Sequence, residues 1–215
     1  MTYSIVPRMI ATMVAATMTL SAIPADNPTP SPAAPAALRD GSLGFTRILV
    51  TQRQPLNPTH VYTYHVEGLK QGGGLEIMSL DGAEPRQLID ASDGVILDCQ
   101  VSYDGSRILF SWKRSMDEPF GIWSIGTDGS GLTPVVVHES NNMNACWLPD
   151  GGIAFLSDRK PAFAYCWTST SPVVYRAEGD GSRVTRLSAN YLTDFTPSVM
   201  RDGRILFSRW EYVDR

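Results

Sequence analysis

Two series of Asp-Gly pairs recur along the chain at matching intervals, and they constrain the fold more than any other feature. In the first series successive aspartates are 46 and then 52 residues apart, and in the second they are 47 and then 52 residues apart. The first series contains Asp104, Asp150 and Asp202, and the second contains Asp81, Asp128 and Asp180. Such spacing indicates a repeat protein with units of about 40–50 residues.

Each unit is expected to contain four strands joined by tight turns. In the second unit we predict strands over residues 99–103, 108–112, 121–125 and 132–137. An Asp-Gly pair suits a hairpin because glycine accepts a positive φ and the aspartate side chain caps the turn. The strand over 108–112 is apolar at consecutive positions, which is typical of a strand covered on both faces. The predicted fold class is therefore an all-β β-propeller of four-stranded blades.

The repeat does not complete a propeller. Its units cover residues 46–90, 93–137, 144–187 and 195–215, which makes about three and a half blades. Propellers close with about 4–8 blades. We therefore expect residues 41–215 to be a partial β-propeller, a fragment of a larger one whose other blades lie downstream. The alternative is an open array that a partner completes.

The N-terminal segment has the composition of an export signal. Arg8 precedes a twelve-residue stretch without charge, and small residues follow as far as Ala25. This stretch is shorter than the ~20 residues that span a bilayer, and it has the length of a signal-peptide core. We predict a signal peptide over residues 1–25, with an ordinary N-terminal helix as the alternative. Residues 26–40 are rich in proline and small residues, and they predict an extended linker.

These features also define the expected compartment and partners. The predicted localisation is periplasmic or secreted, with no transmembrane helix after signal cleavage. The chain has 18 Lys and Arg against 22 Asp and Glu, so its net charge of −4 argues against a nucleic-acid partner. The three cysteines lack C-x-x-C spacing, and we expect no cofactor in this segment. The expected partners are downstream domains of the same protein or another envelope protein.

The longest loops are predicted to gather on one face of the propeller. In each blade, the loop between the second and third strands lies on the same face as the connections between blades. We predict such loops over residues 52–74, 113–119 and 158–172, and they are long and unequal. Insertions concentrated on one face of a repeat protein usually mark its binding face.

Five side chains in these loops are the candidate ligand-binding residues: His60, Tyr62, Tyr64, His65 and Arg159. They can hydrogen-bond, stack and coordinate. If the first loop is extended, His60, Tyr62 and Tyr64 share one side and His65 lies on the other. Two histidines without a clear third ligand leave a metal site undecided, and no catalytic residue is predicted. The alternative interpretation is a loop that packs on the propeller with satisfied polar groups.

Several segments resemble known bacterial propellers. Residues 144–159 resemble the repeat of TolB-like propellers. A narrower resemblance, in residues 54–65, 194–199 and 202–215, is to the N-terminal propeller of proteins related to the hydrazine synthase alpha subunit. This resemblance implies further domains after the propeller and, in true hydrazine synthase, attached c-type haem. The chain contains no C-x-x-C-H, so no haem residue is carried over.

Three functions are compatible with these features. The first is a non-catalytic β-propeller domain of an exported bacterial protein that serves as a binding or assembly scaffold. The second is the propeller portion of a c-type-haem redox enzyme resembling the hydrazine synthase alpha subunit. The third is a TolB-like periplasmic scaffold for envelope proteins.

Overall fold

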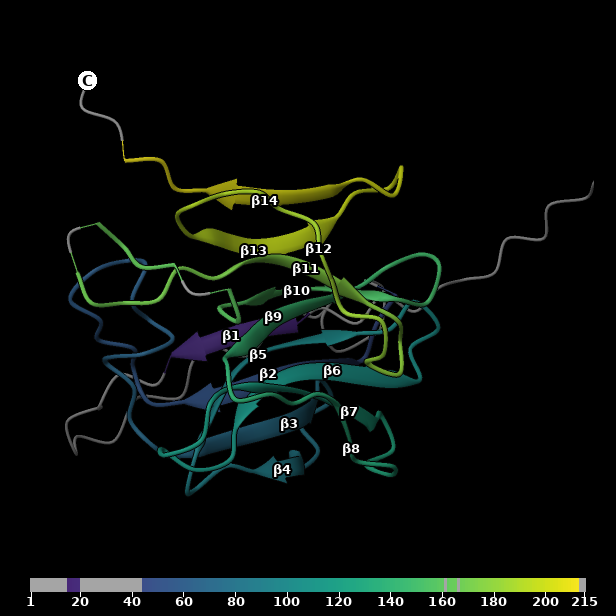
Figure 1. The fold of residues 1–215 in the computed structure, drawn as a ribbon. Helices are drawn as coiled ribbons and strands as arrows, with labels where there is room; N and C mark the ends of the chain where they lie inside the picture. The colour runs from purple at the N-terminus through teal and green to yellow at the C-terminus, as the bar shows by residue number, and fades with distance from the viewer. Residues whose placement is uncertain (1–14, 20–43, 161, 166, 213–215) are drawn as a thin grey trace, which may run out of the picture.

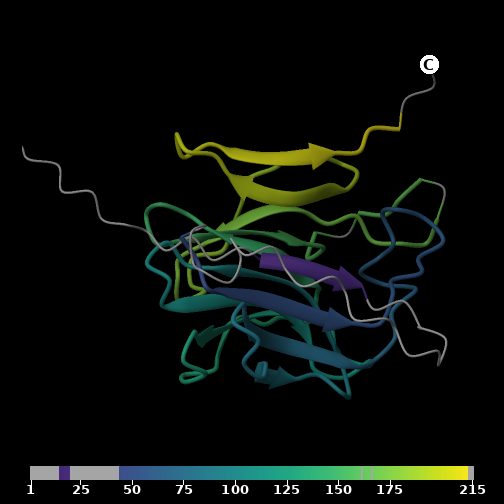
Figure 2. The ribbon, with the colours of Figure 1, turned by 180° about the vertical axis from the view of Figure 1, so that it is seen from behind.

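The computed structural model describes residues 15–19, 44–160, 162–165 and 167–212 (Figure 1). These residues form fourteen strands and no helix. The strands make three four-stranded sheets and one two-stranded sheet, stacked face to face (Figures 1 and 2). The predicted all-β partial propeller is therefore confirmed.

We number the sheets as blades 1 to 4 in chain order. Blade 1 contains β1 (Ala15–Thr19), β2 (Arg47–Arg53), β3 (Gly73–Ser79) and β4 (Arg86–Asp90). Blade 2 contains β5 (Val95–Val101), β6 (Arg107–Lys113), β7 (Gly121–Gly126) and β8 (Thr133–Val136). Blade 3 contains β9 (Asn142–Trp147), β10 (Ile153–Ser157), β11 (Val173–Ala177) and β12 (Thr185–Arg186). Blade 4 contains β13 (Asp194–Val199) and β14 (Ile205–Arg209).

The bounds of one predicted strand are wrong. The first strand of blade 2 was expected over residues 99–103, but β5 begins at Val95 and ends at Val101. Its first three residues are buried and belong to the core. The turn before β6 already starts at Ser102, whose carbonyl accepts the backbone N–H of Gly105 at 2.9 Å. The turn therefore takes more residues than the Asp-Gly pair alone suggests.

Strand β1 was not expected from the sequence. It lies inside the predicted signal peptide and pairs in parallel with β2, with Ala15 opposite Leu49 and Thr19 opposite Arg53. The other adjacent strands of the blades are antiparallel. Cleavage after Ala25 would remove β1 from the exported protein, and that cleavage stays a prediction.

The six Asp-Gly pairs form tight turns, as predicted. In each pair a carboxylate oxygen accepts the backbone N–H two residues further on, at 2.9–3.1 Å. The following glycine has a φ between 74° and 88°. These turns lie at the right-hand end of the sheets in Figure 1, and the loops between second and third strands lie at the left. We call this left-hand end the loop face.

The middle strands are buried on both faces because a blade packs on each side of them. In β6, Leu109 faces blade 3 and packs in one cluster with Phe155. Its neighbours Ile108 and Phe110 face the other way and pack in a second cluster with Leu49 of blade 1. All five side chains are fully buried. The predicted double-sided burial is therefore confirmed, and each buried methylene contributes about 0.8 kcal/mol.

Strand β14 differs because no further sheet among the described residues covers it. Leu206 in this strand is 61% exposed, whereas the equivalent strand β10 is buried at all five positions. The two strands carry similar apolar sequences. The difference in exposure therefore comes from the neighbouring sheet and not from the strand itself.

A substitution at one turn glycine tests the packing between blades. Gly181 has a φ of 83°, and a Cβ there would lie 1.7 Å from the carbonyl oxygen of Val135 in β8. In Gly181→Ala we expect the cost of a positive φ, roughly 1–2 kcal/mol, plus about 1–3 kcal/mol for the steric clash. The control is Gly105→Ala, where φ is 74° but no atom lies within 4 Å. Urea denaturation measures both losses, and equal losses would contradict this packing.

Candidate functional site

The first long loop is folded by its own polar contacts. The carboxylate of Glu67 accepts the backbone N–H of Thr59 at 2.9 Å and also accepts the hydroxyl groups of Thr59 and Thr63. These hydrogen bonds lower the pKa of Glu67 to about 2. The backbone N–H of Thr63 donates to the carbonyl oxygen of His60 at 3.1 Å, so the chain turns at this point. The extended arrangement considered for this loop therefore does not occur.

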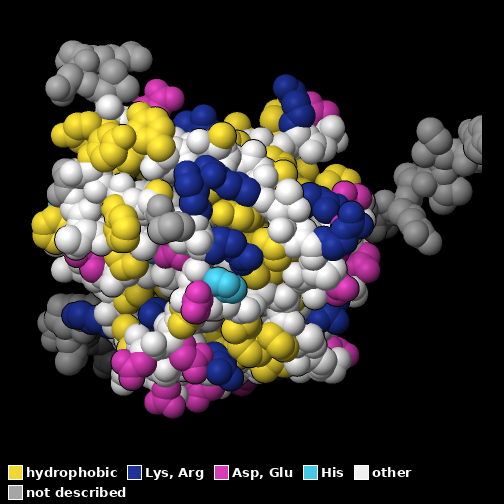
Figure 3. Space-filling model, in the orientation of Figure 1, with side chains coloured by type: hydrophobic (Ala, Val, Ile, Leu, Met, Phe, Trp, Pro, Cys, Tyr) yellow, Lys and Arg dark blue, Asp and Glu magenta, His cyan; other side chains and the backbone are white. Residues whose placement is uncertain are grey.

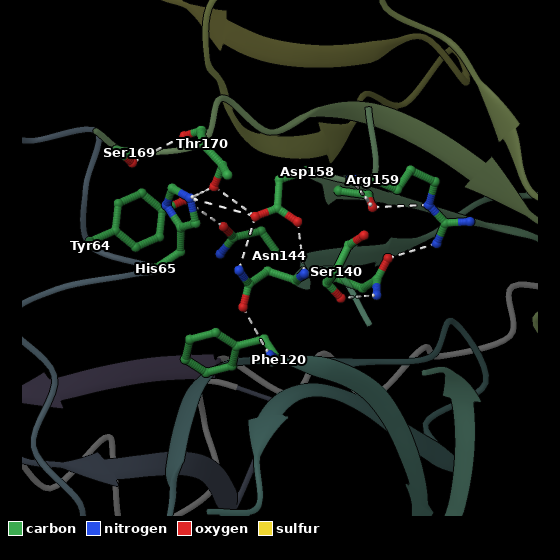
Figure 4. Close-up of polar contacts among 12 residues, drawn as sticks. Tyr64, His65, Phe120, Ser140, Asn144, Asp158, Arg159, Ser169 and Thr170 are labelled. Atoms are coloured by element: carbon green, nitrogen blue, oxygen red, sulfur yellow. Dashed lines mark hydrogen bonds and ion pairs between the residues drawn. The ribbon is translucent and has the colours of Figure 1, made fainter. Parts of the chain in front are cut away.

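Because the loop turns, the five candidate residues lie in different places. His60 and Tyr62 lie in a group of aromatic side chains. Tyr64 and His65 point toward blades 2 and 3, and Arg159 packs inside blade 3 (Figure 4). The structure thus brings two pairs of candidates together, but it does not form one site from all five.

His65 links the loop of blade 1 to the loop of blade 3. Its side chain is 1% exposed, and its Nε2 lies 2.9 Å from Thr170 Oγ1 and 4.0 Å from Asp158 Oδ2 (Figure 4). Thr170 Oγ1 donates to Asp158 Oδ2 at 2.7 Å, so we assign Nε2–H as the donor to Thr170. The buried Nδ1 has no hydrogen-bond partner among the described residues.

The surroundings of His65 favour its neutral form. Burial lowers the pKa of His65 to about 4, and it outweighs the carboxylate of Asp158, which acts to raise it. The charge of Lys113 also lowers this pKa. A proton on Nδ1 would be a buried donor without an acceptor in the described part of the chain. His65 is therefore a neutral, structural anchor of the loop at pH 7.

Asp158 is held in place from two sides. Its carboxylate accepts the backbone N–H of Asn141 at 2.7 Å and the Nδ2 of the same residue at 2.9 Å. The Thr170 hydroxyl provides the third hydrogen bond. This network joins the connection between blades 2 and 3 to the loop after β10, and His65 packs against it.

Tyr64 enters a second polar network near the inner strands. Its hydroxyl donates to Asn144 Oδ1 at 2.8 Å, and Asn144 Nδ2 donates to Asp98 Oδ2 at 2.7 Å. Ser111 Oγ donates to the other oxygen of Asp98 at 2.9 Å. Burial raises the pKa of Asp98 to about 6, although these hydrogen bonds act to lower it. Asp98, Asn144 and Thr196 each lie six residues before an aspartate of the first Asp-Gly series, so they occupy the same position in blades 2, 3 and 4. Through Asn144, Tyr64 joins the loop of blade 1 to this position of the repeat.

Arg159 is occupied within its own blade. Its Nη2 donates to Asn142 Oδ1 at 2.7 Å, and its Nε donates to Ser157 Oγ at 3.0 Å. The guanidinium also lies over the rings of Phe155 and Tyr175, 5.8 and 5.2 Å from their centroids. Figure 4 shows it directed away from the carboxylate of Asp158. Its contacts indicate a packing role rather than an open anion site.

Seven rings form a continuous group on the loop face, which we call the aromatic surface. Successive ring centroids are 4.3–6.0 Å apart in the order Trp167, His60, Tyr62, Trp210, Tyr212, Tyr165, Tyr191. The shortest contact is the stack of Tyr62 on Trp210, whose planes are inclined by 11°. The members come from blade 1, from the loop after β10, and from the segments on both sides of blade 4.

Much of this group faces solvent. Tyr165 is 66% exposed, and Trp167, Tyr191 and Tyr212 are each 44–50% exposed. Figure 3 shows hydrophobic side chains gathered at the upper left, over the end of β14. Tyr62 is only 4% exposed and forms the base of the group.

Sequence reasoning found only part of this group. It singled out His60 and Tyr62 as site residues, but it did not single out Trp210, Tyr191 or Tyr212. Tyr191 lies in a connection between blades, and Tyr212 follows β14. Both segments lie on the loop face, so the predicted order of strands could have placed these two residues in the candidate site.

Two features are absent from the described residues. That part of the chain holds no group of three His, Cys, Asp or Glu side chains placed to bind a metal ion. It also holds no helix of the length and hydropathy needed to cross a membrane.

Known structures share this fold. TolB from Agrobacterium tumefaciens matches with a TM-score of 0.52 and 23% identity, over 63% of this chain and 45% of that one. Hydrazine synthase from Kuenenia stuttgartiensis matches with a TM-score of 0.62 and 16% identity, over 76% of this chain and 28% of that one. No protein-family model matches the chain, and no curated protein is significantly similar to it.

The repeat, the blades and these matches define the class of protein. The chain is a β-propeller domain of four-stranded blades. More particularly, it has the TolB-like propeller fold that the sequence resemblance predicted. It spans less than half the length of either matched structure.

The pH dependence of stability tests the buried state of His65. Its folded pKa of about 4 lies below the ordinary histidine pKa of about 6.5. The unfolded chain therefore binds more protons between these values, and stability falls as pH drops from 6.5 to 4, by about 3 kcal/mol. Asp98 acts in the opposite sense, because its raised pKa of about 6 makes stability increase as pH falls toward 3.8.

A comparison with His65→Gln separates the two contributions. We expect the difference in unfolding free energy between the wild type and this variant to shrink by about 3 kcal/mol from pH 7 to pH 4. The control is His138→Gln, at an exposed position on the connection between β8 and β9. Urea denaturation at each pH provides the values. A difference that stays constant over this range would show that His65 is not buried in its neutral form.

Proposed function

We propose that this chain is a non-catalytic propeller domain of an exported bacterial protein and that it binds its ligand on the loop face. The observation that supports this most directly is the aromatic surface. Tyr165 is in contact with Tyr191 and Tyr212, and these three rings are 49–66% exposed. Trp167 is 44% exposed and joins them through His60, Tyr62 and Trp210. Contiguous exposed aromatic surface of this kind is typical of interaction sites on folded domains.

The loops that carry the surface are held before any ligand arrives. His65 fixes the first loop to Thr170, and Tyr64 fixes it to Asn144. The stack of Tyr62 on Trp210 joins the same loop to the end of β14. Fixed loops reduce the ordering cost of binding, which favours a binding surface over a loop that only connects strands.

Two further roles remain as alternatives. In the first, the domain is the propeller portion of a haem redox enzyme, which is favoured by the resemblance to the hydrazine synthase alpha subunit. This chain has no C-x-x-C-H, so we propose no cofactor for the segment itself. In the second, the domain is a periplasmic scaffold like TolB, and the aromatic surface contacts another envelope protein. Both alternatives keep a periplasmic or secreted location and exclude nucleic acid as partner.

Tryptophan fluorescence of the full chain tests the binding role. We would titrate it separately with chitohexaose and with an uncharged proline-rich peptide, two ligands that stack on aromatic rings. We expect at least one of them to change the emission, and Trp167→Ala to abolish most of that change. The matched control is Tyr103→Ala, a residue that is 54% exposed next to an Asp-Gly turn. The binding role is wrong if neither probe gives a saturable change.

Intact-mass measurement tests export. The full chain, produced in a bacterial host with the ability to export proteins, should be recovered outside the cytoplasm without residues 1–25. This is expected because a short uncharged stretch after Arg8 ends in small residues at Ala25. Recovery of exported material that retains these residues would contradict the prediction.

A further inference from the structure

We infer that the aromatic surface is the docking site for the proline-rich segment of this same chain, residues 26–37. The inference rests on the proposed function, because it assigns a ligand class to the same surface. That class is an uncharged peptide in the polyproline II conformation.

The surface has the chemistry that such a peptide requires. Polyproline II segments have no internal hydrogen bonds and expose their carbonyl oxygens, and they dock on grooves lined by aromatic rings. Six of the seven rings are Tyr or Trp. Tyr165, Tyr191 and Tyr212 add hydroxyl groups, and Trp167 adds an indole N–H. These rings offer flat apolar faces for proline, together with donors for peptide carbonyls.

The segment has the matching composition. It contains Pro28, Pro30, Pro32 and Pro35, and the last two form a P-x-x-P sequence with two alanines between them. No charged residue occurs between Asp26 and Arg39. An uncharged segment therefore meets a surface made almost entirely of uncharged rings. Proline also fixes φ in advance, so less conformational entropy is lost on docking.

The segment can reach the surface from the attachment to β2. Residues 38–46 connect the end of this segment to β2, and nine extended residues span about 30 Å at roughly 3.3 Å per residue. Strand β2 has seven residues and spans about 23 Å from its start to the loop face. The connection is therefore longer than the strand whose length it has to cover.

Before signal cleavage the segment is also attached to β1, and this attachment likewise allows it to reach the aromatic surface. Thr19, the last residue of β1, lies opposite Arg53, the last residue of β2. The chain therefore leaves β1 at the loop face, where the first long loop also begins. The inference holds whether or not the signal peptide has been removed.

Hydroxyl-radical footprinting read by mass spectrometry tests this docking in the full chain. The variant carries Pro30→Ala, Pro32→Ala and Pro35→Ala, which keep the segment uncharged but remove its stiffness. A tethered segment has an effective concentration in the millimolar range, so a millimolar affinity protects the surface about half of the time. We expect Trp167 and Tyr165 to be oxidised about twofold faster in the variant than in the wild type. Tyr103 is the internal control and should not change.

Adding the peptide in trans identifies the occupant. Excess synthetic peptide of residues 26–37 should restore protection of Trp167 in the variant, and the same peptide with the three prolines replaced by alanine should not. Equal oxidation in wild type and variant would overturn the inference, as would a parallel change at Tyr103. Protection by chitohexaose but not by the peptide would also overturn it, while leaving the proposed binding function standing.

Discussion

Face-to-face packing of the sheets is the interaction on which the rest of the structure depends. A strand that is apolar at consecutive positions, such as β6, must have a partner on each face. Leu109 and Phe110 are neighbours in sequence, yet each is fully buried against a different blade. Because every blade meets its neighbours in this way, the loops between second and third strands project from the same end. The aromatic surface is a consequence of that alignment.

The surface joins parts of the chain that are far apart in sequence. The stack of Tyr62 on Trp210 brings the loop of blade 1 to the end of blade 4. Beneath it, His65 contacts Thr170, and Tyr64 contacts Asn144. These polar contacts lie in places of low water access, where a satisfied hydrogen bond is stronger than in water. The network therefore fixes the position of the rings, and the exposed ring faces supply the capacity to bind.

The repeat predicts much of the fold because its signals are local. An Asp-Gly pair contains the chemistry of its own turn, and a consecutive apolar run indicates double-sided burial without knowledge of the partner. Strand β1 was missed because its pairing with β2 is a long-range choice that a short uncharged run does not encode. The site was found only in part for the same reason. Arg159 looks available in the sequence, but its Nη2 and Nε donate to Asn142 and Ser157 and its guanidinium packs over two rings once blade 3 has formed.

Residue-resolved amide hydrogen exchange tests most directly whether double-sided burial organises the molecule. Strands that a blade covers on each face open only when blades separate, so their amides exchange slowest. We expect the greatest protection in β6 and β10 and the least in β14, although β10 and β14 carry similar apolar sequences. Equal protection of β10 and β14 would contradict the account, because it would show that stability comes from each sheet alone and not from the packing between them.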